Sequence, residues 1–199
     1  EAIRLFKNAL SLDPSHKHAM NNLGYSYLWQ GKLEKARETI KKTLELYPDY
    51  AIAWNNLGIC YFHGDKIEKA KEAYQKAKEL DINYDLPWSN LSEIFLIEGS
   101  NERALNHARK ALELVNTNYE AWFFVGLAQY KLGNIEEAIK AYEQTLNLDS
   151  ENKATYDLED HRVWSCLGQA LEKKGNFKHA VEAYGKSLSL KPNQEDANM

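Results

Sequence analysis

The residues that could perform catalysis or hold a metal are few, and their spacing matches no arrangement that does so. The chain has six histidines and two cysteines, without an H-E-x-x-H pair, a C-x-x-C pair, a G-x-S-x-G turn or a glycine-rich phosphate loop. His16 and His18 flank a predicted helix start, but the ligand set around them is sparse for zinc. Cys60 is expected in the core, and nothing near Cys166 in sequence would activate its thiol. We therefore expect no enzyme activity, no metal and no cofactor.

Asparagine is the polar residue whose spacing does suggest chemistry, and that chemistry is hydrogen bonding. Asn22, Asn56 and Asn90 are 34 residues apart, and Phe124 and Cys166 follow in the later units. A side-chain amide has donors and an acceptor, so it can pair with both the C=O and the N–H of an extended peptide. Each such bond would add about 0.5–1.5 kcal/mol to binding. Three in line would hold a peptide backbone without reading its side chains.

An internal repeat provides the elements that must position these asparagines. Trp54, Trp88 and Trp122 share the period of 34 with alanines, glycines and leucines at other positions, and every marker then shifts by 42. An insertion of eight residues explains the shift. The chain is thus predicted to be one array, consisting of a half repeat at 1–16, full repeats at 17–50, 51–84, 85–118, 119–152 and 161–194, an insertion at 153–160 and a stub at 195–199. Because it starts in mid-repeat and ends in a stub, we expect a fragment of a longer array.

Each repeat is predicted to contain two antiparallel helices. In repeat 51–84, small and apolar residues recur at three- and four-residue spacing, first before and then after a Gly-Asp break. Helices can approach closely only where side chains are small, so Gly58 and Ala70 are expected to mark the tightest contacts, with Trp54 filling the wider gap. Four other glycines are expected to end first helices: Gly31, Gly99, Gly133 and Gly175.

Two stretches carry a resemblance to a known family. WNNLGICY at 54–61 with EKAKEAYQKAKEL at 68–80, and WFFVGLAQY at 122–130 with EEAIKAYEQTLNL at 136–148, resemble the tetratricopeptide repeat. The resemblance implies an all-α fold, a right-handed superhelical α-solenoid of antiparallel helix pairs. It also implies that the first helices line a concave groove, and that such a groove binds peptide segments of other proteins.

The resemblance implies which residues face the groove. The asparagine row is similar to the asparagine ladder in the repeat domain of O-linked N-acetylglucosamine transferase. Because asparagine is common at this place in the family, both ligand contact and a structural role stay open. Trp29 is the one tryptophan off the repeat's structural position, which favours it as an anchor. The expected groove residues are Asn22, Asn56, Asn90, Tyr25, Trp29, Phe62, His63, Phe124, Tyr130 and Arg162.

One family subtype is not expected. Repeat domains that clamp the acidic C-termini of heat-shock chaperones use lysine or arginine at positions that here hold Asn21, Leu86 and Asn90. We expect instead a scaffold or adaptor that binds an extended peptide or a helix of a partner protein. The alternative is a substrate-recruiting segment of a larger enzyme such as a glycosyltransferase. A third hypothesis is self-association through the end repeats.

Composition excludes other partner classes. Lysine and arginine total 25 against 29 acidic residues, so the net charge of −4 gives no drive toward nucleic-acid phosphates. No apolar run approaches the roughly 20 residues that a membrane-spanning helix needs, so membrane insertion is not expected. The two distant cysteines are not a disulfide framework, which favours a reducing, cytoplasmic setting.

Overall fold

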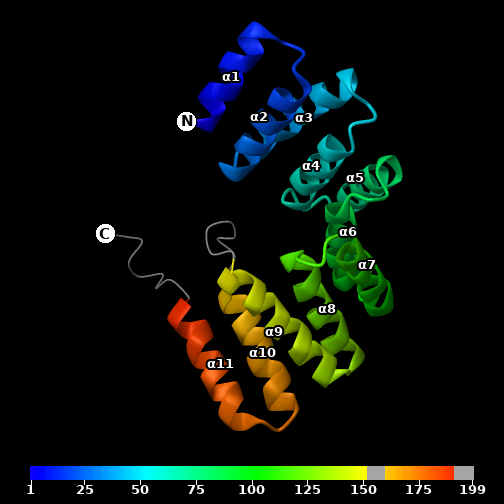
Figure 1. Cartoon of the computed structure of the whole chain (residues 1–199). Helices are drawn as coiled ribbons and strands as arrows, with labels where there is room; N and C mark the ends of the chain where they lie inside the picture. The colour runs from blue at the N-terminus through cyan, green and yellow to red at the C-terminus, as the bar shows by residue number, and fades with distance from the viewer. Residues whose placement is uncertain (152–159, 191–199) are drawn as a thin grey trace. The chain divides into compact units, whose positions relative to one another are not determined.

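The predicted all-α fold is confirmed by a computed structural model, which describes residues 1–151 and 160–190 (Figure 1). These residues contain helices and no strand. Most of the predicted insertion at 153–160 and the whole stub at 195–199 lie outside the described residues. The helices are α1 Ala2–Leu12, α2 Lys17–Trp29, α3 Leu33–Leu46, α4 Ala51–Phe62, α5 Ile67–Leu80, α6 Asp85–Ile97, α7 Asn101–Leu114, α8 Tyr119–Leu132, α9 Ile135–Glu151, α10 Asp160–Lys173 and α11 Phe177–Leu190.

The chain divides into two compact units, residues 1–91 (unit 1) and 92–199 (unit 2), with the division inside α6. In unit 1, α2 packs against α1 and α3, and α4 packs against α3 and α5. In unit 2, α8 packs against α7 and α9, and α10 packs against α9 and α11. Short turns join the two helices of each pair, so each unit is a stack of antiparallel helix pairs (Figure 1).

Gly58 and Ala70, which were expected to mark the tightest contacts, are both buried, and the side chain that packs directly on Gly58 is an aromatic ring. A Cβ atom on Gly58 would overlap the ring of Tyr74 in α5, whereas Ala70 is merely fully buried. The same overlap recurs between Gly126 and Tyr142, Gly168 and Tyr184, and, with an isoleucine, Gly24 and Ile40. Glycine is therefore needed to make room for the large side chain 16 residues later, and not for the small alanine.

In the third repeat the first-helix residue is the larger one of its type and the second-helix residue is small. Ser92 replaces the glycine and Ala108 replaces the ring. The Ser92 hydroxyl is buried and donates a hydrogen bond of 2.8 Å to the Ala104 carbonyl in α7. The larger first-helix residue is thus tolerated because its partner is small.

The repeated tryptophans do more than fill the gap between helices. Trp54 is half-buried against the core of unit 1, which includes Ile40, Leu44 and Leu57. Its indole N–H donates to the Pro48 carbonyl at 2.7 Å, in the turn before α4. Trp88 and Trp122 make the same bond to the carbonyl six residues earlier. Each tryptophan therefore holds the preceding turn against its own first helix.

Left-handed backbone marks the end of most first helices. The four glycines expected there all have positive φ, between 69° and 86°. In the second repeat the equivalent residue is Asp65, with φ of 56°. Aspartate reaches this region at an energetic cost because its Cβ crowds the backbone, whereas glycine reaches it freely.

Replacing Asp65 with glycine is therefore expected to stabilise the protein. The Asp65→Gly variant should gain about 0.5–1 kcal/mol in free energy of unfolding, since the left-handed conformation no longer strains a side chain. Urea denaturation followed by circular dichroism measures the gain. The reciprocal change Gly133→Ala, at φ 86°, should lose stability. A less stable Asp65→Gly protein would contradict this account.

Candidate functional site: the asparagine ladder

The asparagines of unit 1 form a hydrogen-bonded ladder that joins successive first helices. Asn56 Nδ2 in α4 donates to Asn21 Oδ1 in α2 at 3.0 Å. Asn90 Nδ2 in α6 donates to Asn55 Oδ1 in α4 at 2.9 Å. Asn21 Nδ2 donates in turn to Asn22 Oδ1 at 3.3 Å. The amide donors of Asn56 and Asn90 are thus directed to neighbouring repeats.

Asn21 and Asn55 are ladder members in addition to the predicted Asn22, Asn56 and Asn90. Both are fully buried, and both precede a predicted asparagine directly. The signal that would find them is the recurring pair Asn-Asn, Asn-Asn, Ser-Asn at the repeat period. Asn56 is 6% exposed, while Asn22 is exposed and keeps free surface.

We call the ladder face the side of α2, of α4 and of residues 85–91 of α6 that carries this row. Gly24 and Gly58, on the opposite side of α2 and α4, contact the second helices α3 and α5. The ladder face is therefore the side of the first helices turned away from their own second helices. The residues at its repeating positions are His18, Asn21, Asn22, Tyr25, Leu28 and Trp29 in α2, then Ile52, Asn55, Asn56, Ile59 and Phe62 in α4 and His63 directly after it.

Two aromatic pairs border the ladder, and all four of their members are predicted site residues. Tyr25 and Trp29 stack edge to face in α2 with ring centroids 6.0 Å apart, and their side chains are 36% and 74% exposed. Phe62 is half-buried and lies against the exposed His63, with ring centroids 6.1 Å apart. Such exposed rings offer large apolar contact area at little conformational cost.

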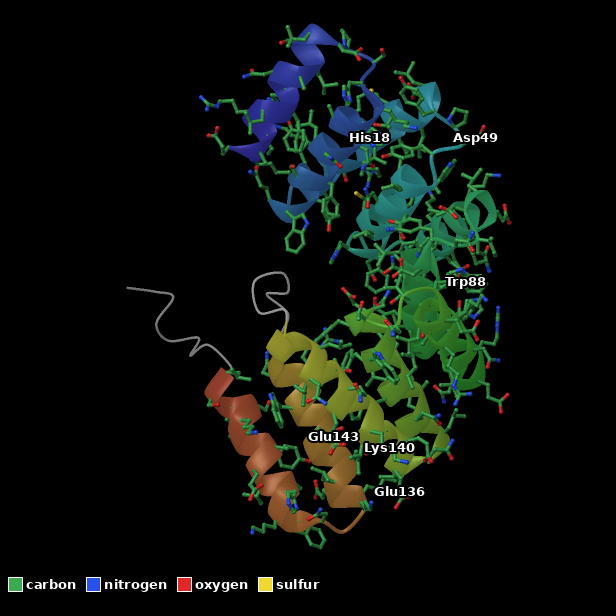
Figure 2. All side chains as sticks on the ribbon, in the orientation of Figure 1. His18, Asp49, Trp88, Glu136, Lys140 and Glu143 are labelled. Atoms are coloured by element: carbon green, nitrogen blue, oxygen red, sulfur yellow. The ribbon has the colours of Figure 1, made fainter. Side chains whose placement is uncertain are left out.

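Tyrosine hydroxyls add uncharged hydrogen-bonding groups near the start of the first helices. The Tyr50 hydroxyl lies 3.0 Å from Nδ1 of His18, which Figure 2 labels on α2. Burial raises the pKa of the Tyr84 phenol, and the nearby Asp85, Tyr25 and Tyr50 raise it further. Tyr50 and Tyr84 are 34 residues apart, so the repeat period could have identified them as residues with the same place in successive repeats.

The predicted site residues of unit 2 are placed differently. Phe124, which has the register of the asparagines, is 7% exposed and packs in the interior, so it offers a ligand little surface. Tyr130 is half-buried, with the Lys173 ammonium 4.9 Å from its ring centroid. Arg162 is exposed, with its guanidinium 5.7 Å from the Phe123 ring centroid.

Charge distinguishes the equivalent side of unit 2. Glu93 in α6 has the register of Tyr25, and Arg162 has the register of His18. Burial raises the pKa of the Glu93 carboxyl, the Arg162 guanidinium lowers it in part, and Glu120 raises it. A hollow of about 390 Å³ beside Arg162 is lined by Phe123, Leu127, His161, Arg162, Ser165, Cys166, Ser187 and Leu188.

The raised pKa of Glu93 predicts a pH-dependent stability. Because the folded state favours the protonated carboxyl, the destabilisation is absent below the unfolded pKa and fully present above the folded pKa. Glu93→Gln should therefore unfold at a higher urea concentration than the natural protein at pH 7, with the difference disappearing near pH 4. A lower midpoint at pH 7 would show that Arg162 more than compensates for burial.

Two other hollows lie on the far side of the first helices, between successive second helices. One of about 630 Å³ lies between α3 and α5 with Trp54 and Leu57 in its wall. The other, of about 410 Å³, lies between α9 and α11 with Trp164 and Leu167 in its wall. Their walls use the same repeat positions, so they follow from repeat geometry. Exposed charges gather on this side, as Glu136, Lys140 and Glu143 on α9 illustrate (Figure 2).

The cysteines and acidic groups offer little reactivity. Cys60 is buried as predicted, and burial raises the pKa of its thiol to about 12. Burial also raises the pKa of Cys166. Among the described residues, no three histidine, cysteine, aspartate or glutamate side chains cluster as metal ligands would. None of the helices in the described ranges is both long and apolar enough to cross a membrane.

Comparison with known proteins agrees with the geometry. Tetratricopeptide repeat family models match residues 18–83, 119–152 and 161–194. No curated protein sequence matches the chain. The structure is similar to one solved in the APC/C hetero-tetramer Cut9-Hcn1 (TM-score 0.86, 19% identity), covering 98% of this chain and 37% of that one. This chain therefore spans well under half of that relative.

Two further solved structures share the fold over most of their own length. PilF of Pseudomonas aeruginosa has a TM-score of 0.77 and 20% identity, with 93% of this chain and 80% of that chain covered. YrrB, described as a tetratricopeptide protein with an unusual peptide-binding site, has a TM-score of 0.64 and 20% identity, with 96% and 94% covered. At these identities the likeness concerns the fold.

Proposed function

The chain belongs to the tetratricopeptide repeat family, whose members are in general interaction modules, and we propose that it binds a segment of a partner protein on the ladder face of unit 1. In this role it acts as a scaffold or adaptor without catalysing a reaction. The same face would serve if the chain were the substrate-recruiting part of a larger enzyme.

The exposed Tyr25–Trp29 pair is the observation that supports this proposal. Trp29 is 74% exposed, whereas the tryptophans at the repeat position are half-buried. Trp and Tyr in such positions dominate the energetics of many protein interfaces. The pair borders the ladder, where Asn22 presents free amide surface. An aromatic anchor next to backbone-binding amides suits a peptide segment better than it suits a small substrate.

The experiment is a selection of displayed random peptides on the natural protein and on a Tyr25→Ala/Trp29→Ala variant. Trp29 is 74% exposed and Tyr25 is 36% exposed, so the variant should keep its circular dichroism spectrum, and its unfolding midpoint measures the packing lost at Tyr25. Peptides enriched by the natural protein should fail to bind the variant. Phe177→Ala, which removes a 66% exposed ring from α11, is the matched control and should bind as the natural protein does. Equal binding by all three proteins would refute the proposal.

Self-association is a second candidate, favoured by the apolar side of α11. Val181 and Leu188 are 70% and 73% exposed and lie two helical turns apart on that helix. Light scattering over a concentration series tests this candidate, with Val181→Glu/Leu188→Glu as the variant that should remain monomeric. A natural protein that is monomeric at every concentration would eliminate it.

A further inference from the structure

The ladder-face positions of α2 and α4 carry no formally charged side chain, with histidine counted as neutral, and the first carboxylate at such a position is Glu93, three residues after Asn90 on α6. The positions in α2 and α4 hold amides, aromatic rings, imidazoles and branched apolar groups. Two further charged groups lie at the starts of first helices. Lys17 stands over the Tyr50 ring with its ammonium 4.7 Å from the centroid, and Asp85 begins α6.

Most charged residues on the helices of unit 1 belong to its second helices instead. Glu38 and Lys42 in α3 form an ion pair of 2.9 Å, and Glu34 and Arg37 form another. The hollow between α3 and α5 has lysines and glutamates around its apolar wall. A charged partner segment would therefore find more counter-charges on that side than at the ladder-face positions of α2 and α4.

The neutral face selects against charge by desolvation. A carboxylate or ammonium group pressed against it would lose water without gaining an opposite charge, which is costly. Asn22, which is exposed, can satisfy peptide groups of any sequence, because its amide pairs with neutral donors and acceptors. The rings of Tyr25 and Trp29 gain most from an apolar side chain.

We infer that the ladder face of unit 1 takes an uncharged stretch of polypeptide whose aromatic or branched apolar residue packs on Tyr25 and Trp29. This inference rests on the proposed function and names the chemistry of its ligand. Unit 2 differs, because Glu93 and Arg162 place charge at the equivalent repeat positions. A ligand on unit 2 would therefore be selected partly by its charged residues. A ligand on the ladder face of unit 1 would be selected for having none.

The test first determines the amino-acid composition of the selected peptides and then measures how added charges change the affinity of one of them. Peptides that depend on Trp29 should be depleted of Asp, Glu, Lys and Arg around an apolar core. The best of them is synthesised with free ends blocked, together with versions in which two neighbouring polar residues become Asp or Lys. Each charged version should bind at least about tenfold more weakly, since an unpaired charge is desolvated on the face.

Salt separates the possible outcomes. The affinity of the neutral peptide should change less than about twofold between 0.1 and 1 M NaCl, while the screening length falls from about 10 to 3 Å. A selected peptide that depends on Trp29 but needs its charges would overturn the inference and leave the proposed function standing. Enrichment of no peptide that depends on Trp29 would overturn both.

Discussion

The Tyr142→Ala variant is expected to lose about 3–5 kcal/mol of unfolding free energy, the range found when large buried rings are truncated. Tyr142 is 1% exposed and is the largest fully buried side chain of the described residues. Its ring packs against Gly126, and its centroid lies 6.1 Å from that of Phe123. Alanine would leave a cavity that the two helices α8 and α9 cannot close without moving. Chemical denaturation of the purified protein measures the loss.

Two controls isolate the role of packing in that loss. Tyr184 has the same register in the last repeat but is only half-buried, so Tyr184→Ala should cost less than Tyr142→Ala. The combination found naturally in the third repeat provides the rescue. Adding Gly126→Ser to Tyr142→Ala reproduces the Ser92 and Ala108 pair and should recover part of the stability, whereas Gly126→Ser alone should destabilise. No recovery would contradict the size exchange between these two positions.

The Asn21→Ala variant is expected to lose about 1–3 kcal/mol, because it leaves a buried donor without its partner. Asn56 Nδ2 donates to Asn21 Oδ1 at 3.0 Å, and both side chains are buried. Removing the acceptor leaves the Asn56 amide shielded from water and unpaired. The loss is measured by urea denaturation, as a decrease in the midpoint with an unchanged slope.

A double-mutant cycle attributes this loss to the hydrogen bond between the two asparagines. Asn21→Ala/Asn56→Ala should lose less than the sum of its single variants, with a coupling of about 0.5–3 kcal/mol. Asn22→Ala removes the exposed acceptor of the longer bond from Asn21 Nδ2, 3.3 Å, and should therefore cost less than Asn21→Ala. Additive losses would mean that the ladder contributes no bond between repeats.

The same contacts decide how the asparagines can be tested for binding. Replacing Asn22, Asn56 and Asn90 together would leave Asn21 Oδ1 and Asn55 Oδ1 without their donors. A loss of binding in that variant would then mix lost ligand contacts with a weakened stack of first helices. Trp29 and Tyr25 avoid this ambiguity, because their surface is exposed.

The repeat and its helices were predictable from sequence, since their period comes from side-chain size at fixed spacing. Cys60 was placed in the core for the same reason, as a small residue on the buried face of its helix. The Gly58–Tyr74 contact was missed because Ala70 also has the right period and is also buried. The sequence signal that identifies Tyr74 and not Ala70 as the partner of Gly58 is the size exchange between the two positions, in which glycine occurs with a large side chain and Ser92 with Ala108.

The candidate site was less predictable, because its hydrogen bonds cross between repeats. The sequence indicates that Asn56 lies on the ladder face, but not that its amide turns toward a residue 35 positions earlier. That direction depends on how α2 and α4 pack together. Phe124 shows the same limit, since it shares the register of the asparagines and yet packs inside unit 2, where an apolar ring is more stable.

Indole N–H resonances provide the most direct test of where a partner segment binds. The chain has five tryptophans, and Trp29 alone borders the ladder face, while Trp54 and Trp164 line the hollows between second helices. On titration with a selected peptide, the Trp29 indole resonance of ¹⁵N-labelled protein should shift, and those of Trp54 and Trp164 should stay in place. Shifts at Trp54 or Trp164 with an unmoved Trp29 resonance would contradict binding on the ladder face.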